Sequence, residues 1–391
     1  MMRVAVFTGS RADYGLLRPL LRLLRVDDRF ELRLIVTGAH LDEAHGMTVR
    51  EIEAEGMPIS ARVPLPLDDD SLSGVARAMG AAVGGVADAL EEWTPDVLVV
   101  LGDRYEAFAA AAAATVLRVP IAHIHGGELT YGAIDDAFRH SITKMADLHF
   151  TATREYRRRV IQMGADPSTV HDVGALAADN ALAAPDLSPD EFEERYHVRC
   201  DRDTLLVTFH PASAGGDSAD HLRALLEALD RLADFHVLFT GSNADAEGSV
   251  LTAMVRDYVA AHGDRAAFVV SLGHDGYMAA VRNAAAVVGN SSSGIIEVPI
   301  LGVPSVDIGD RQAGRLRPAS VIHVEPTAGA IIPAVLQATS EEFRSLAAGS
   351  GNPYGDGHTA ERIVKVLADS GGLAAARTAS FFDIDFGDDG L

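Results

Sequence analysis

The chain has 391 residues, more than one hydrophobic core usually supports, so two domains are expected. Its formal net charge of −23 argues against nucleic acid and anionic membranes as partners, because their phosphates would be repelled, but a local basic cleft could still hold an anionic small molecule. Cys200 is the single cysteine, and the sequence shows no signal peptide and no apolar run of membrane-spanning length, so a cytoplasmic protein is expected.

Short apolar segments alternate with helical segments over the first half of the chain. Strands are predicted at VAVFTG, LRLIVTG, DVLVVLG, PIAHIHGG and LHFTAT. Helices are predicted at residues 16–24, 72–92, 106–117 and 133–145. This βαβ alternation is typical of a parallel sheet covered by helices on both faces.

A polar, proline-containing stretch interrupts this alternation near residues 180–203. Within it, Ser188 and Pro189 predict the cap and first turn of a helix. Strands then resume at TLLVTFHP, HVLFTG, AFVVSLG, AAVVGN, PSVDIG and VIHVE.

The fold class predicted is therefore α/β, with two doubly wound, Rossmann-like domains. They are expected at residues 1–182 and 203–366. Residues 367–391 are expected to form an acidic C-terminal extension that is loosely attached and does not hold a metal ion.

Ligands of open parallel sheets bind beyond the carboxyl ends of the strands, so the residues that follow each strand are candidates for a site. Arg11 follows the first strand and either holds a phosphate or pairs with Asp13. The same segment lacks the GxGxxG spacing and the Walker lysine, which disfavours nicotinamide and P-loop sites. Asp103 and Arg104 follow another strand, where they form either a structural ion pair or part of a site.

The segment IAHIHGGELTYGAIDD ends a strand with an unusual number of ionisable groups. It carries His125, Glu128, Asp135 and Asp136 beside a Gly-Gly pair that lets the backbone approach a ligand closely. The two aspartates could instead cap the following helix or favour its positive end.

The second domain offers groups that suit a nucleotide. His210 directly follows a strand and is either a ligand-facing imidazole or a turn residue. GNSSSG, which contains Ser291 and Ser292, precedes a predicted helix, and its free N–H groups and hydroxyls favour an anion unless the serines only cap the helix. Glu297 could accept hydrogen bonds from both hydroxyls of a ribose, and Arg311 follows another strand. Together the two domains suggest a nucleotide-activated sugar bound in the cleft between them.

Five segments, taken together and in this order, resemble the hydrolysing UDP-N-acetylglucosamine 2-epimerases of sialic-acid pathways. They are SRADYGLLRPLL, GDRYE, IHGGELTYGAIDDAFRHSITK, FHP and GNSSSGIIEVPILGVPSVDIGDRQAGR, and the resemblance spans about residues 3–365. It implies a fold of the glycosyltransferase-B type, no metal or other cofactor, and conversion of UDP-GlcNAc to N-acetylmannosamine and UDP. Some members of this family act on UDP-linked bacillosamine derivatives instead.

The resemblance also implies roles for individual residues. Asp103 and Asp135 match the positions assigned to acid–base catalysis. The nucleotide-binding positions are matched by Arg11, Arg104, His210, Asn243, Ser291, Ser292, Glu297 and Arg311. His125 departs from the family pattern, because several relatives have a glutamate there; either His125 or Glu128 then transfers protons, or the substrate differs.

The implied reaction explains why these residue types are needed. The C2 hydrogen becomes acidic only as the anomeric C–O bond breaks, so the enzyme must stabilise departing UDP while a carboxylate removes the proton. Hydration of the resulting 2-acetamidoglucal then places the new hydrogen on the opposite face, which requires at least two acid–base groups. The carboxylates and His125 supply them, and His210 is a further candidate that could hold diphosphate charge.

Three alternatives remain open at this point. They are a non-hydrolysing epimerase, a glycosyltransferase of the same fold, and a nucleotide-sugar sensor without catalysis. The expected partners are a UDP-sugar substrate and the UDP product, with no nucleic acid and no membrane, and the expected assembly is a homodimer or homotetramer.

Overall fold

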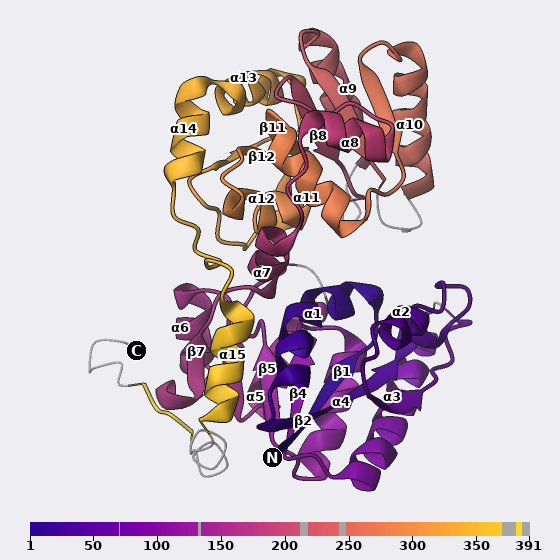
Figure 1. Ribbon diagram of the computed structural model, residues 1–391, viewed down its shortest axis with the longest axis vertical. Helices are drawn as coiled ribbons and strands as arrows, with labels where there is room; N and C mark the ends of the chain where they lie inside the picture. The colour runs from indigo at the N-terminus through magenta and orange to yellow at the C-terminus, as the bar shows by residue number, and fades with distance from the viewer. Residues whose placement is uncertain (70, 132–133, 212–217, 242–247, 370–380, 385–391) are drawn as a thin grey trace. The chain divides into compact units, whose positions relative to one another are not determined.

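The computed structural model describes residues 1–69, 71–131, 134–211, 218–241, 248–369 and 381–384. The chain divides into two compact units, each built on one parallel sheet (Figure 1). Unit 1 comprises Met1–Leu129, Ile134–Asn180 and Gly357–Leu391, and unit 2 comprises Thr130–Ala133 and Ala181–Asp356. Two doubly wound parallel sheets confirm the predicted fold class. No described helix has the length and apolar character needed to cross a membrane.

Unit 1 contains a seven-stranded parallel sheet in the order β3-β2-β1-β4-β5-β6-β7. Its strands are β1 (Met2–Thr8), β2 (Phe30–Thr37), β3 (Ile59–Val63), β4 (Val97–Leu101), β5 (Ile121–Ile124), β6 (Leu148–Thr151) and β7 (Val170–Asp172). Its helices are α1 (Arg11–Val26), α2 (Val49–Ala54), α3 (Leu72–Trp93), α4 (Tyr105–Val116), α5 (Asp135–Met145), α6 (Arg154–Gln162) and α15 (Thr359–Ala368), with 3-10 turns η1 (Gly38–Leu41) and η2 (Pro167–Thr169). Helix α7 (Leu176–Ala183) leads from unit 1 into unit 2.

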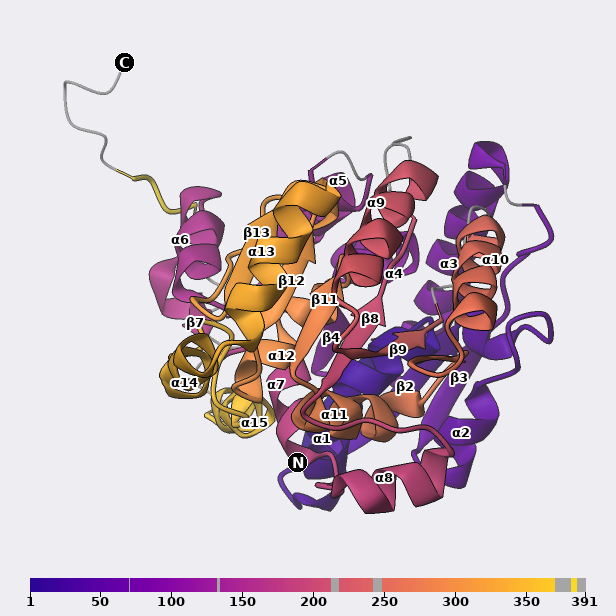
Figure 2. The ribbon, with the colours of Figure 1, turned by 90° about the horizontal axis from the view of Figure 1, so that it is seen from above.

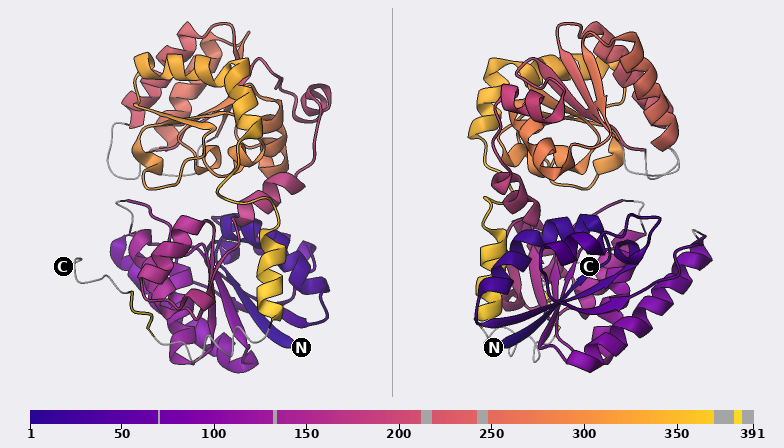
Figure 3. Two further views of the ribbon diagram at one scale, coloured as in Figure 1. Left: turned by 90° about the vertical axis from the view of Figure 1, so that its left-hand side faces the viewer. Right: turned by 45° about the vertical axis from the view of Figure 1, so that its right-hand side comes forward.

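Alternating side chains of the strands form two separate cores, one on each face of this sheet. In β1, Val4 and Val6 join the core under α1 and α15, whereas Ala5 and Phe7 join the core under α3 and α4. Figure 3 shows the twisted strands of unit 1 between these helix layers. Because helices cover both faces of the sheet, side chains within the strands are mostly apolar. Polar side chains that could contact a ligand therefore lie at the strand ends.

Helix α15 corrects the expected domain boundary, which placed residues up to 366 in the second domain. The helix belongs to unit 1 because Ile363, Val364 and Leu367 are buried in the same core as α1. The extension after it is also less detached than expected: the Phe382 N–H donates to the Gly164 carbonyl at 3.0 Å, and the Lys144 Nζ lies 4.7 Å from the centre of the Phe381 ring.

Unit 2 contains a six-stranded parallel sheet in the order β10-β9-β8-β11-β12-β13. Its strands are β8 (Thr204–Thr208), β9 (His236–Thr240), β10 (Ala266–Val269), β11 (Ala286–Gly289), β12 (Ser305–Ile308) and β13 (Val321–Val324). Its helices are α8 (Pro189–Tyr196), α9 (Ser218–Arg231), α10 (Gly248–Ala261), α11 (Gly273–Asn283), α12 (Glu297–Ile300), α13 (Ala328–Thr339) and α14 (Glu341–Gly349), with 3-10 turns η3 (Ser292–Gly294) and η4 (Asp310–Gln312).

The strands of unit 2 again separate two cores. Leu205 and Val207 of β8 pack with α9, α10 and α13, and Leu206 packs with α8 and α11 on the other face (Figure 2). The predicted start of α8 is confirmed, because Ser188 and Glu191 form a reciprocal capping box and Pro189 occupies the first turn.

Both sheets reverse their strand order beside the first strand of the unit. The reversal lies between β1 and β4 in unit 1 and between β8 and β11 in unit 2. The crevice outside the carboxyl ends at such a switch point is where open parallel sheets bind ligands. Residues 9–13 and 102–106 therefore flank the switch point of unit 1, and residues 209–211 and 290–293 flank that of unit 2.

Candidate functional site

Arg139 connects three acidic segments at the carboxyl edge of the sheet in unit 1. Its guanidinium pairs with Asp103, which follows β4, and with Asp136 at 2.5 Å, on the first turn of α5. It also donates to the backbone carbonyl of Glu128 at 3.1 Å. Only 3% of Arg139 is exposed, whereas 28% of the Asp103 side chain remains accessible. A buried cation thus holds an accessible carboxylate in a defined position.

Asp135 lies beside this cluster as the first residue of α5. Burial raises the pKa of the Asp135 carboxyl above its usual range, and the negative charge of Asp103 raises it further. The charges of Arg104 and Arg139 act in the opposite direction. Asp103 and Asp135 are therefore neighbouring carboxyl groups, of which Asp103 is ion-paired with Arg139 and Asp135 has a raised pKa. Such a pair can supply one base and one acid.

His125 and Glu128 form a second titratable pair in the same unit. His125 Nδ1 lies 3.1 Å from a carboxylate oxygen of Glu128, and both side chains are largely buried. The backbone of His125 is left-handed, with φ +67°, and its N–H donates to the Phe150 carbonyl at 2.9 Å. A non-glycine residue rarely adopts this conformation, and such outliers are often retained at functional sites.

The Gly-Gly pair that follows His125 is required by packing. A Cβ at Gly126 would lie 3.0 Å from both His123 Nδ1 and Thr143 Oγ1. At Gly127, where φ is +80°, a Cβ would lie 2.5 Å from the Tyr156 carbonyl oxygen. The glycines therefore let this loop pack closely against α5 and α6, in addition to any approach to a ligand.

His123, a buried residue of β5, connects the strand and helix that carry this cluster. One ring nitrogen lies 2.8 Å from the Gly102 carbonyl oxygen and the other lies 3.2 Å from Thr143 Oγ1, so the ring connects the end of β4 to α5. Complete burial lowers the pKa of His123 to about 4, which keeps the imidazole neutral at physiological pH. Arg139 and His123 were both missed as site residues from the sequence; the i, i+4 spacing from Asp135 to Arg139 was the available signal.

The residues after β1 make contacts within unit 1. Arg11 is 70% exposed and lies 3.3 Å from Glu51, so it pairs with Glu51 and not with Asp13, and its expected role in holding a phosphate stays a prediction. Asp13 instead closes the turn, accepting from the N–H of Gly9 at 2.8 Å and of Ser10 at 3.2 Å. Arg104 binds both carboxylate oxygens of the buried Glu106, at 3.1 and 2.9 Å.

In unit 2, Asn290 joins the ends of β8 and β11. Its side chain accepts from the His210 N–H at 2.7 Å and donates to the His210 carbonyl at 2.8 Å. Arg311 donates to the carbonyl oxygens of Asn290 and Pro211, both at 3.2 Å. These bonds bring together His210 and Arg311, which lie far apart in the sequence.

The GNSSSG segment is less helical than expected. Ser291 caps the 3-10 turn η3 by accepting from the Ser293 N–H at 3.4 Å, and Ser292 begins that turn. The helix after it, α12, has only four residues, so it cannot supply the dipole of a full helix. Backbone N–H groups and hydroxyls therefore have to carry any anion binding here.

Glu297 begins α12, where burial raises the pKa of its carboxyl above the usual range. Asn243 lies outside the described residues. Within the part of the chain that the structure describes, no cluster of three or more His, Cys, Asp or Glu side chains is arranged to hold a metal ion.

Comparison with known proteins places this chain in a family. A family model described as UDP-N-acetylglucosamine 2-epimerase matches residues 22–368. Polysialic acid biosynthesis protein P7 of Escherichia coli is 38% identical over 371 residues, covering 94% of each chain. The GDP/UDP-N,N'-diacetylbacillosamine 2-epimerase (hydrolyzing) of Campylobacter jejuni is 35% identical over 324 residues, covering 83% of this chain and 84% of that protein.

A solved structure shares the fold. The UDP-GlcNAc 2-epimerase from Neisseria meningitidis, determined with UDP-GlcNAc bound, superposes with a TM-score of 0.74 at 18% identity. The similarity covers 94% of this chain and 100% of that chain.

Proposed function

Because the chain belongs to the UDP-N-acetylglucosamine 2-epimerase family, we propose that it is a hydrolysing epimerase that converts UDP-GlcNAc to N-acetylmannosamine and UDP. The observation that carries this proposal is the pair of neighbouring carboxyl groups in unit 1, one ion-paired with Arg139 and one with a raised pKa. Inversion at C2 by elimination and hydration requires such a pair.

The reaction begins with loss of UDP. As the anomeric C–O bond breaks, C1 gains positive charge and the C2 hydrogen becomes acidic enough for a carboxylate to remove. The product of this step is 2-acetamidoglucal. Addition of water across C1 and C2, with protonation of C2 on the opposite face, gives the free sugar with inverted C2.

In this scheme the carboxylate of Asp103 is the base, because Arg139 holds it in place while leaving it accessible. Asp135 is the proposed acid, since burial and the charge of Asp103 raise its pKa above the usual range of a carboxyl group. The His125–Glu128 pair moves the second proton or positions the water. Asp136 orients Arg139 from the other side.

Unit 2 has the groups that suit UDP. Arg311, Ser291 and Ser292 would bind the diphosphate, with His210 beside them, and Glu297 would accept from the ribose hydroxyls. Charge-assisted hydrogen bonds to the departing diphosphate stabilise the negative charge that develops as the bond breaks. Arg104 and Asn243 remain proposed contributors to nucleotide binding.

A second substrate is favoured by one finding, which is the 35% identity to the C. jejuni diacetylbacillosamine epimerase. That sugar presents the same C1–C2 chemistry, so the proposed acid–base set serves both. Groups that recognise C4 and C6 of the sugar would distinguish the two substrates.

The test is incubation of the purified chain with UDP-GlcNAc and, separately, with UDP-N,N'-diacetylbacillosamine, followed by proton and phosphorus NMR. The expected result is stoichiometric UDP with free N-acetylmannosamine, and a higher kcat/KM for UDP-GlcNAc. Higher kcat/KM for the bacillosamine derivative would replace the substrate and keep the reaction. UDP-N-acetylmannosamine as the product, with no UDP released, would contradict the hydrolytic assignment.

A further inference from the structure

A large cavity in unit 2 lies away from the residues proposed to bind UDP. Its volume is about 830 Å³, within the range of small-molecule sites, which is about 300–1,000 Å³. Arg202, Asn283 and Pro304 line it, and these residues lie one to three positions before the first residues of β8, β11 and β12. The cavity is therefore at the amino ends of the strands, whereas His210, Ser291 and Arg311 follow the carboxyl ends of the same three strands.

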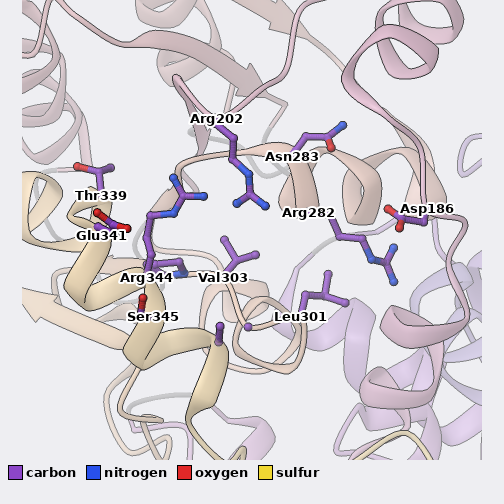
Figure 4. Close-up of a pocket in the computed structure, with 13 residues that line it drawn as sticks. Asp186, Arg202, Arg282, Asn283, Leu301, Val303, Thr339, Glu341, Arg344 and Ser345 are labelled. Atoms are coloured by element: carbon purple, nitrogen blue, oxygen red, sulfur yellow. The ribbon is translucent and has the colours of Figure 1, made fainter.

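Two arginines in this cavity face one another. Figure 4 shows the guanidinium groups of Arg202, from the loop before β8, and Arg344, from α14, directed toward each other. Within the described part of the chain, neither side chain makes an ion pair or hydrogen bond. Burial lowers the pKa of the Arg344 guanidinium, and the nearby positive charge of Arg202 lowers it further.

This arrangement is unusual in a chain with 56 acidic and 33 basic residues. Asp186 and Glu341 also line the cavity, but neither lies within ion-pair distance of the two arginines. Arg282, the third arginine of the cavity, already donates to the carbonyl oxygens of Ala181, Ala184 and Pro185. Arg202 and Arg344 therefore have donors available, and an anion between them would relieve their repulsion.

The remaining lining suits a ligand with an organic body. Leu301 and Val303 give an apolar wall, and Asn283 and Thr339 add polar atoms. The Asn283 amide donates to the Leu187 carbonyl at 3.1 Å, and the Thr339 hydroxyl donates to the Val335 carbonyl at 2.8 Å. Both side chains are thereby held in place, and both keep oxygen lone pairs that can accept from ligand hydroxyl or amino groups.

We propose that this cavity is a second ligand site, which binds a phosphate-bearing small molecule of about nucleotide size through Arg202 and Arg344. Arginine pairs recognise phosphate by bidentate hydrogen bonds, and two of them facing one another fit a dianionic group. Since the cavity opens at the opposite end of the strands from the proposed UDP-binding residues, the site is separate from catalysis. The proposal does not depend on the proposed reaction.

The test is calorimetric titration of the full chain with inorganic pyrophosphate, comparing wild type with Arg202→Ala/Arg344→Ala. Arg223→Ala/Arg231→Ala removes the same charge from the exposed surface of α9 and is the matched control. We expect the cavity variant to bind pyrophosphate at least ten-fold more weakly at one site, or not at all there, and the control variant to keep this binding. Equal pyrophosphate binding by wild type and the cavity variant would overturn the proposal.

Two further measurements keep the result interpretable. Without ligand, the melting temperature of the cavity variant should match or exceed that of the wild type, because the repulsion between the two arginines is removed. If the double variant does not fold, the single Arg202→Gln variant replaces it in the titration. Citrate is the second probe: we expect weaker binding than for pyrophosphate, and equally tight citrate binding dependent on both arginines would overturn the assignment to phosphate. Turnover of the UDP-sugar should be unchanged in the cavity variant, and its loss would show that the cavity is not separate from catalysis.

Discussion

Replacing Arg139 by lysine tests the central arrangement of unit 1. The arginine reaches Asp103 with one terminal nitrogen and both Asp136 and the Glu128 carbonyl with the other. Lysine keeps the charge but has one ammonium on a flexible chain, so it cannot span these acceptors with fixed geometry. At least one charge-assisted hydrogen bond is lost, which costs about 1.5–3 kcal/mol in the free energy of unfolding.

Turnover should fall further than stability alone explains. The ion pair with Arg139 holds Asp103 in place, and a misplaced base loses its contribution of about 10²-fold or more to the rate. We therefore expect kcat of Arg139→Lys to fall by about 10²-fold, while calorimetric affinity for UDP stays within about two-fold because its proposed ligands are in unit 2.

Arg157→Lys is the matched control for this measurement. Arg157 is also in unit 1 and also bridges two acceptors, the carbonyl oxygens of Val170 and Pro167, both at 2.8 Å. Among the residues that the structure describes, it makes no hydrogen bond or ion pair with the proposed site, so its variant should lose stability but keep kcat within about three-fold at a temperature where it is folded. Full activity in Arg139→Lys would refute the claim that this arginine positions the base.

The remaining predictions concern protonation and the C-terminal segment. Asp135→Asn should lower kcat by about 10²-fold or more. Because the acid must be protonated to act, the kcat of the wild type should also fall as pH rises through the raised pKa of Asp135. An Asp135→Asn variant with normal turnover would contradict this role. His149 has a pKa lowered by burial to about 3, against 6.5 when unfolded, so protonation of the unfolded chain removes stability as pH falls below 6.5. Relative to His149→Gln, wild type should lose about 1.4 kcal/mol of unfolding free energy between pH 7.5 and 5.5, measured by urea denaturation, and a pH-independent difference would contradict burial as the cause. In Gly164→Ala, the new Cβ would lie 2.2 Å from the Phe381 ring and should displace the C-terminal segment. Limited proteolysis should then remove this segment faster than in the wild type, as it should in Phe381→Ala. Unchanged cleavage in both variants would contradict the contact.

Much of the fold was predictable because buried parallel strands have a clear sequence pattern. The strands around His123 and Val207 are short apolar runs bounded by polar or glycine residues, and their alternation with helices indicates the topology. The family indicated by the motifs is confirmed by the model that matches residues 22–368. The placement of α15 was not predictable, because an amphipathic helix shows which face it buries but not which of two cores receives it.

Part of the candidate site was predictable from the ionisable groups that follow strand ends. Asp103, Asp135 and Asp136 were proposed because such groups at strand ends and helix starts need a reason other than packing; the structure places them near Arg139, and their catalytic roles stay predictions. Arg139 was missed because its partner Asp103 is 36 residues away, a proximity that only the tertiary structure establishes. The conformation of Arg11 could not be read from its motif, since a strand-end arginine can turn either toward a ligand or toward an exposed carboxylate such as Glu51.

The most direct test of the proposed reaction is turnover of UDP-GlcNAc in D₂O with no acceptor present. If a carboxylate removes the C2 proton and the glucal is then hydrated, the free sugar should be N-acetylmannosamine with deuterium at C2, formed together with one equivalent of UDP. The label is read from loss of the C2 proton signal and from the mass of the product. Release of UDP with N-acetylglucosamine that retains its C2 proton would show simple hydrolysis and contradict the assignment of this chain as a 2-epimerase.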